Sequence, residues 1–95
     1  MTEWLARIQV TLKPVVNDPE GLSIEQALHQ LGFDGVTSVR AGKYFEVEMR
    51  GGDRRAAAAQ TEAMCQRLLA NPVIEQYRFT LARRSSRRGA PAARR

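Results

Sequence analysis

The stretch VRAGKYFEVEM, residues 39–49, joins a short basic turn to a strongly alternating segment. Its apolar side chains fall on every second residue: Phe45, Val47 and Met49. A period of two residues with one apolar face predicts a half-buried β-strand over residues 44–50. We expect a second strand over residues 36–40, joined to the first by a tight turn at Ala41-Gly42. The stretch therefore predicts a β-hairpin.

Two amphipathic helices are predicted on either side of this hairpin. Ser23 precedes apolar residues spaced as on one helix face, and Gln26 completes a capping box, so the first helix is expected from Ser23 to Leu31. Gly32 follows it as a left-handed cap. The second helix is expected over residues 54–69, capped by Asp53 and ended by Asn71-Pro72.

Two further strands complete the pattern, at residues 4–13 and 73–81. The resulting order is β-α-β-β-α-β, which predicts a ferredoxin-like α+β sandwich: a four-stranded antiparallel-type sheet with both helices on one face. A 95-residue chain has a thin core, so we also expect it to be oligomeric.

The basic charge of the chain is confined to one end. The whole chain has a net charge of +5, but residues 83–95 hold six arginines and no acid, whereas residues 1–82 hold nine Lys or Arg and ten acids. We therefore predict one domain, residues 1–82, and a disordered Arg-rich tail, residues 83–95. Such a tail would contact nucleic acid without sequence specificity.

The sequence offers little for catalysis or metal binding. The single histidine, His29, lies off the apolar stripe of the first helix, and the single cysteine, Cys65, lies within that of the second. One His and one Cys do not make a metal site of the usual type, and a lone buried thiol behaves as a small apolar residue. A lone thiol and the absence of a signal peptide or membrane-length apolar run predict a cytoplasmic protein.

The basic turn is equally unsuited to phosphate or RNA. A phosphate loop needs glycines that lead into a helix N-terminus, whereas the turn at Gly42 leads into a strand. RNA-recognition sheets stack bases on exposed aromatic residues, but here Glu46 and Glu48 stand beside Tyr44 and would repel a phosphate backbone. The residues thus favour a small binding module over an independent enzyme.

Four segments in order resemble the PurS family, the small subunits of phosphoribosylformylglycinamidine synthase: VTLKPVVNDPEG (10–21), IEQALHQLGF (24–33), VRAGKYFEVEM (39–49) and MCQRLLANPVIEQYRF (64–79). The resemblance spans about residues 6–82. It implies a non-catalytic dimer or tetramer that bridges a large PurL-type synthetase subunit and a PurQ-type glutaminase subunit. It also implies that ATP and Mg bind the large subunit and that this chain binds no cofactor.

The residues that match the family pattern without serving the core are candidates for the partner interface. They are Arg40, Gly42, Lys43 and Tyr44 in the turn, and Asn71, Pro72 and Glu75 at the helix–strand junction. For Asn71-Pro72 a plain helix stop is an equal interpretation. The alternative function is a small ferredoxin-like module that binds nucleic acid through its basic tail.

Overall fold

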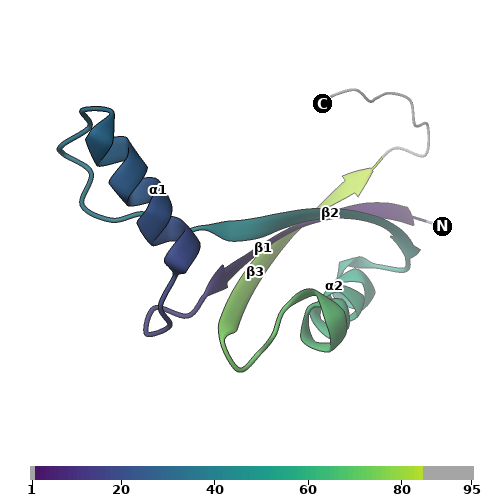
Figure 1. Cartoon of the computed structure of the whole chain (residues 1–95). Helices are drawn as coiled ribbons and strands as arrows, with labels where there is room; N and C mark the ends of the chain where they lie inside the picture. The colour runs from purple at the N-terminus through teal and green to yellow at the C-terminus, as the bar shows by residue number, and fades with distance from the viewer. Residues whose placement is uncertain (1, 85–95) are drawn as a thin grey trace.

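The structure, a computed structural model, describes residues 2–84 and contains three strands and two helices (Figure 1). Their order is β1 (Thr2–Leu12), α1 (Pro19–Gln30), β2 (Gly42–Gly51), α2 (Arg54–Met64) and β3 (Glu75–Arg84). A π-helical turn, η1 (Cys65–Leu69), continues α2. The α+β class is confirmed, and the sheet is antiparallel throughout.

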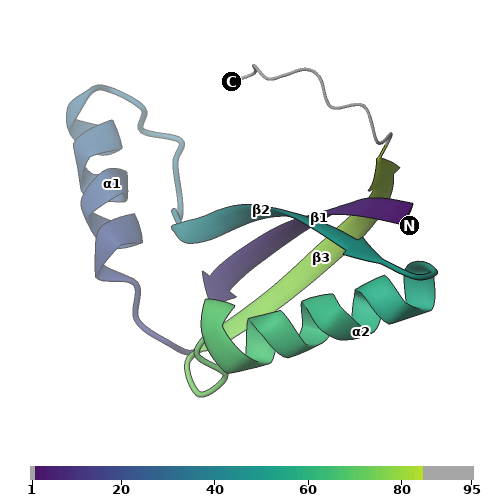
Figure 2. The ribbon, with the colours of Figure 1, turned by 90° about the vertical axis from the view of Figure 1, so that its right-hand side faces the viewer.

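The sheet has the order β2-β1-β3, with β1 in the centre. Ile8 of β1 lies opposite Phe45 of β2 and Phe79 of β3, so the predicted alternation places apolar residues of all three strands on one face. We call this the helix face, because α2 packs against it (Figure 2). The other face, the open face, carries polar residues such as Arg7, Gln9 and Arg78.

The predicted fourth strand is wrong in the described chain. Residues 36–41 have no regular secondary structure, and the sheet has three strands. The backbone of this segment is held by side chains from elsewhere: the Ala41 N–H donates to Asp18 and the Val36 carbonyl accepts from His29. These local bonds replace the ladder that a strand beside β2 would have formed.

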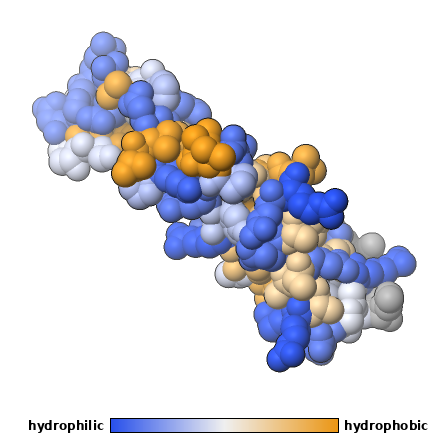
Figure 3. Space-filling view, turned by 90° about the horizontal axis from the view of Figure 1, so that it is seen from below, coloured by the Kyte–Doolittle hydropathy of each residue, from blue (hydrophilic) through white to orange (hydrophobic). Residues whose placement is uncertain are grey.

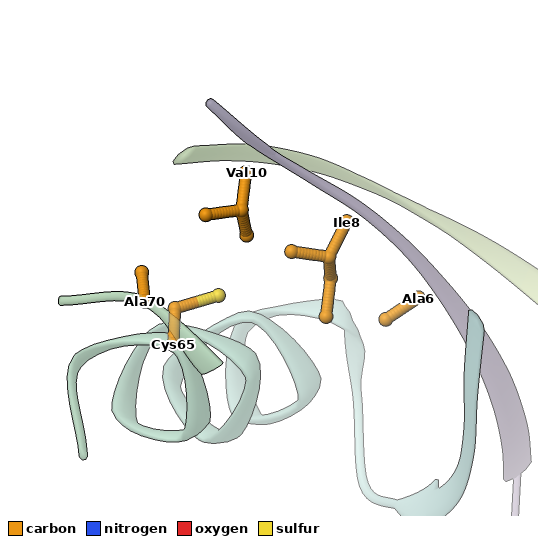
Figure 4. Close-up of a cluster of buried hydrophobic side chains, with 5 residues drawn as sticks. All are labelled: Ala6, Ile8, Val10, Cys65 and Ala70. Atoms are coloured by element: carbon orange, nitrogen blue, oxygen red, sulfur yellow. The ribbon is translucent and has the colours of Figure 1, made fainter. Parts of the chain in front are cut away.

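The core lies between β1 and the η1 turn that continues α2. Ala6, Ile8 and Val10 project from β1 toward Cys65 and Ala70, and all five are buried (Figure 4). Half-buried residues of the outer strands, such as Phe45 and Phe79, surround them. Burial of these side chains holds α2 against the sheet.

The second helix starts where the sequence predicts and ends differently. Asp53 caps it, since its carboxylate accepts a 2.9 Å hydrogen bond from the Ala56 N–H. Its buried side includes Ala57, Thr61 and Cys65, as expected. The last turn is π-helical, which is wider than an α-turn, and Leu68 in this turn is 82% exposed.

The first helix starts one turn earlier than predicted. Its N-cap is Asp18, not Ser23, and Pro19 occupies the first turn, where a missing N–H has no cost. The predicted C-terminal cap is confirmed: Gly32 has φ 99°, and the Phe33 N–H donates to the Leu28 carbonyl.

The prediction that both helices cover one sheet face is wrong for α1. This helix projects from the end of the sheet, and both ribbon views show it standing away from the strands (Figures 1 and 2). Gly21 is its only buried residue. Of the helices within residues 2–84, α2 with its continuation η1 covers the helix face.

The predicted Arg-rich tail lies mostly outside the described residues. Its first two residues, Arg83 and Arg84, are the end of β3, and Arg84 pairs with Glu48 of β2 at 2.9 Å. Residues 85–95 are not described. No helix within residues 2–84 is long and apolar enough to cross a membrane.

Candidate partner interface

The structure brings the seven candidate residues to one end of the sheet. Gly42 at the start of β2 lies opposite Thr11, and Glu75 at the start of β3 lies opposite Leu12, so both groups flank the C-terminal end of β1. The turn residues and the junction residues are therefore neighbours, although more than 25 positions separate them in sequence.

Arg40 holds the base of α1 to the sheet. Its guanidinium donates hydrogen bonds to the carbonyls of Lys13, at 3.0 Å, and Val16, at 2.9 Å. These two carbonyls follow β1, where the chain leaves the sheet, and have no strand partner there. Arg40 thus has an intramolecular role, and its role at a partner surface stays a prediction.

Asp18 completes this attachment from the other side. One carboxylate oxygen accepts from the Gly21 N–H at 2.9 Å, and the other accepts from the Ala41 N–H at 2.7 Å. The side chain is nearly buried, and the two backbone hydrogen bonds hold the pKa of its carboxyl below the usual range. We call Asp18 and Arg40 together the clamp.

Two glycines allow the close approach of backbone segments around the clamp. A Cβ at Gly21 would lie 2.2 Å from the Val39 carbonyl oxygen. A Cβ at Gly42 would lie 2.6 Å from the Val10 carbonyl oxygen. Gly42 is required by lack of space beside β1, because any side chain there would clash with the β1 backbone.

Glu75 links the two candidate groups. Its carboxylate lies 3.5 Å from the Lys43 ammonium, on the helix face, and accepts a 2.7 Å hydrogen bond from the Asn71 N–H. The Glu75 side chain is 14% exposed, whereas that of Lys43 is 54% exposed. Lys43 therefore remains accessible to a partner, while Glu75 mainly orders the junction.

Asn71 and Pro72 form the turn between η1 and β3. The Asn71 side-chain oxygen accepts from the Val73 N–H at 3.0 Å, and its carbonyl accepts from Ile74. This is the turn chemistry of asparagine, so the helix-stop interpretation accounts for its geometry. Both residues are exposed.

Tyr44 lies on the open face, where charges are paired. Its hydroxyl donates to Glu46 at 2.9 Å, which raises the pKa of the phenol, and Arg7 approaches the same carboxylate at 4.0 Å. Tyr44 itself is 53% exposed. The acids that the sequence places beside Tyr44 are Glu46 and Glu48. Arginines of β1 and β3 partly neutralise their charge.

The two residues with catalytic potential have structural positions. His29 is exposed, and its Nε2 lies 2.7 Å from the Val36 carbonyl, to which it donates. Cys65 is fully buried, and that burial raises the pKa of its thiol. Within residues 2–84, no three His, Cys, Asp or Glu side chains cluster in a way that suits a metal ion.

Sequence reasoning missed Asp18, whose carboxylate accepts two backbone hydrogen bonds at this end of the molecule. An Asp before a Pro marks a helix start, and Asp18-Pro19 fits this signal. That signal was sufficient to find the N-cap. The bond to Ala41, 23 residues away, has no local signal.

Comparison with known proteins assigns the family. The family model PurS, described as phosphoribosylformylglycinamidine (FGAM) synthase, matches residues 5–83. The chain belongs to the PurS family. One relative, the phosphoribosylformylglycinamidine synthase subunit PurS of Synechocystis, is 49% identical over 75 residues, which is 79% of this chain and 75% of the relative.

Solved structures of the PurS family share the fold. Bacillus subtilis PurS has 38% sequence identity and a TM-score of 0.76, with 83% of this chain and 98% of that chain covered. A chain in the structure of PurLQS from Thermotoga maritima has 29% identity and a TM-score of 0.80, with 86% and 100% covered. The PurS resemblance expected from the four sequence segments is thereby confirmed.

Proposed function

We propose that this chain is the small subunit of a phosphoribosylformylglycinamidine synthase and bridges a synthetase subunit to a glutaminase subunit. The observation that carries the proposal is the family match over residues 5–83, together with relatives named as subunits of this ligase. The similar chain in PurLQS indicates that such a subunit assembles with PurL and PurQ.

The reaction explains why a subunit without catalytic groups is useful. The synthase converts formylglycinamide ribonucleotide, ATP and glutamine to the corresponding amidine. The large subunit would bind ATP and Mg and activate the substrate oxygen, while the glutaminase would release ammonia. Ammonia that escapes is lost to solvent, so a scaffold that holds the two sites in register raises turnover without chemistry of its own.

The candidate interface suits this role because four of its residues, Lys43, Tyr44, Asn71 and Pro72, remain exposed after their internal contacts are counted. Lys43 and Tyr44 are each more than half exposed at the same end of the sheet as Asn71 and Pro72. Tyrosine is enriched at protein–protein interfaces, and the Lys43 ammonium can pair with an acidic group of a partner. The cytoplasm, where purine precursors are made, is the proposed location.

Reconstitution tests the proposal. The chain alone is expected to show neither synthase nor glutaminase activity, and adding it to its synthetase and glutaminase subunits should restore glutamine-dependent amidine formation. Ammonia-dependent amidine formation by the synthetase alone serves as the control. If the glutamine-dependent rate is the same with and without this chain, the proposed function is wrong.

A paired variant tests the interface residues. Lys43→Glu with Tyr44→Ala should weaken co-purification of the complex, because it reverses one accessible charge and removes one exposed aromatic ring. Arg40 is a poor choice here, because its substitution would also release the base of α1. The matched control is Arg55→Glu on the exposed side of α2. Full assembly of the paired variant would refute the site assignment.

A further inference from the structure

The end of the sheet opposite the candidate interface carries two arginines over one tryptophan. Trp4, near the start of β1, is buried, and the guanidinium carbon of Arg54 lies over its ring at 5.2 Å from the centroid, that of Arg83 at 5.6 Å. Arg54 opens α2, and Arg83 lies opposite Trp4 in β3. Both ribbon views place the start of α2 and the end of β3 near this end of β1 (Figures 1 and 2). We call Arg54 and Arg83 the arginine pair.

The arginine pair has no acidic partner within residues 2–84. The ion pairs of that part of the chain join other basic residues to carboxylates, including Arg84 to Glu48 at this same end. The Arg54 guanidinium donates to a neutral group, the Leu81 carbonyl, at 3.1 Å. Two cations that share one ring repel each other, and an anion in contact with both relieves that repulsion. The pair is therefore suited to an anion from outside the described chain.

The chain adds more arginines where it leaves this end of the sheet. β3 ends at Arg84, and residues 85–95 hold four arginines and no acid. Residues 14–36, around α1 at the other end of the molecule, hold four acids and no Lys or Arg. Strongly hydrophilic side chains, in deep blue, project from the right-hand half of the molecule in Figure 3, the half with the start of β1 and the end of β3. Such a positive end attracts a polyanion.

Single-stranded nucleic acid is the polyanion that fits these groups best. A guanidinium offers forked donors that match a phosphate, and unpaired bases stack on guanidinium planes. Arg54 and Arg83 are exposed, so the side of each guanidinium that faces away from Trp4 is open to a ligand. An acidic peptide would satisfy the charge but leave these planes uncovered. The exposed position suits a polymer rather than an enclosed small molecule.

We propose that the arginine pair, together with the arginines of residues 85–95, binds single-stranded nucleic acid. Phosphates contact the guanidinium groups and bases stack on the pair, so the sequence of the bases is not read. Trp4 is buried and holds the two side chains in place without reaching the bases. This activity is separate from the proposed synthase role, because the candidate interface lies at the other end of β1.

The test uses the purified chain alone, so its outcome is independent of the synthase assay. Fluorescence anisotropy measures binding of a labelled single-stranded RNA of mixed sequence and about 20 nucleotides. If the pair and the four arginines of residues 85–95 contact phosphates, log K should fall with log salt with a slope of about −4. Arg54→Gln with Arg83→Gln should reduce the slope to about −3 and weaken binding about tenfold at about 0.1 M salt.

Two further variants separate the parts of the surface. Replacing the four arginines of residues 85–95 with glutamine should reduce the slope to about −1.5 and leave measurable binding by the pair. Arg54→Lys with Arg83→Lys keeps the charge but loses the planar groups, so it should keep the slope and bind about threefold more weakly. Trp4 is the only tryptophan of the chain, so its fluorescence should change when RNA contacts the pair.

The matched control is Arg67→Gln with Arg78→Gln. It removes the same charge from exposed arginines away from Trp4, since Arg67 lies in η1 and Arg78 lies opposite Gln9, and it should change neither slope nor affinity.

Three results would overturn the proposal. Unchanged binding by Arg54→Gln with Arg83→Gln would mean that residues 85–95 act alone. Equal weakening by the control would mean that net charge, not this surface, decides the affinity. Competition by polyglutamate as strong as competition by unlabelled RNA would mean that the surface takes an acidic protein.

Discussion

Asp18 and Ala41, 23 positions apart, are joined by a 2.7 Å hydrogen bond from the Ala41 N–H to the Asp18 carboxylate. The same carboxylate caps α1 through Gly21. One side chain thus fixes both where the first helix starts and where the chain re-enters the sheet as β2. The position of α1 at the end of the sheet therefore depends on this side chain.

Acid should release α1 from the end of the sheet before it unfolds the sheet and α2. The pKa of Asp18 is lowered by its backbone hydrogen bonds, so its stabilising effect is complete above the unfolded value of 3.8 and is lost as pH falls through the folded pKa. Amide hydrogen exchange of residues 19–31, measured between pH 5 and pH 2.5 (about the range in which carboxyls titrate) and corrected for intrinsic rates, should show this loss.

Asp18→Asn should reproduce the acid effect at neutral pH. The amide keeps one acceptor oxygen, so it cannot accept from both Gly21 and Ala41. Faster exchange is expected in α1 but not in β1. The control is Asp53→Asn. Asp53 caps α2 through a single hydrogen bond from the Ala56 N–H, so its substitution should leave α1 protected from exchange. Equal protection of α1 in Asp18→Asn and wild type would show that the clamp is dispensable.

Gly42→Ala should destabilise the sheet. The new Cβ would lie 2.6 Å from the Val10 carbonyl oxygen, so β1 and β2 must move apart. The expected loss is about 1–3 kcal/mol in the free energy of unfolding, measured by urea titration. Gly35→Ala is the control, because a Cβ there meets no atom within 4 Å. Similar unfolding midpoints for the two variants would contradict the packing at Gly42.

The strands and α2 were predictable because their signals are local. Alternation in β1 places Ala6, Ile8 and Val10 on one side whatever lies elsewhere in the chain. The cap at Asp53 is likewise decided within three residues. The predicted strand over residues 36–40 failed because its backbone bonds go to Asp18 and His29, which the pattern of valines does not reveal.

The position of α1 was not predictable from its periodicity. A stripe containing Ile24 and Leu31 predicts that one side of the helix is buried in a contact. It does not say whether that contact is with its own sheet or with another chain. What decides between them is the clamp, which joins Asp18 and Arg40 to backbone groups far away in sequence. The sequence was sufficient to choose the candidate interface residues. It was not sufficient to show that they converge at one end of β1, because that depends on the register of β2 and β3 against β1.

Lys43 and Glu75 should contribute unequally to stability, although they form one ion pair. Lys43→Ala removes a pair whose ammonium side chain is 54% exposed, so the loss should stay below about 1 kcal/mol. Glu75→Ala also removes the acceptor of the Asn71 N–H, and about 1–2 kcal/mol is expected. Urea titration measures both. If Lys43→Ala lowers the free energy of unfolding more than Glu75→Ala does, the ion pair contributes more than the hydrogen bond from Asn71, and the prediction is wrong.

Cys65 should resist thiol reagents while the chain is folded. Its side chain is fully buried, and burial raises the pKa of the thiol, so at pH 8 the folded protein holds less thiolate than an exposed cysteine would. Labelling with a disulfide reagent should therefore be limited by opening of the contact between η1 and β1, and addition of urea should accelerate it.

Ile8→Ala, which leaves a cavity beside Cys65 in the core cluster, should lower the free energy of unfolding by about 2–5 kcal/mol and speed labelling in proportion. The control is Leu68→Ala, an exposed residue of the same turn, which should leave the labelling rate unchanged. Rapid labelling of the native wild-type chain would mean that the thiol is accessible and that the core around Ile8 is open.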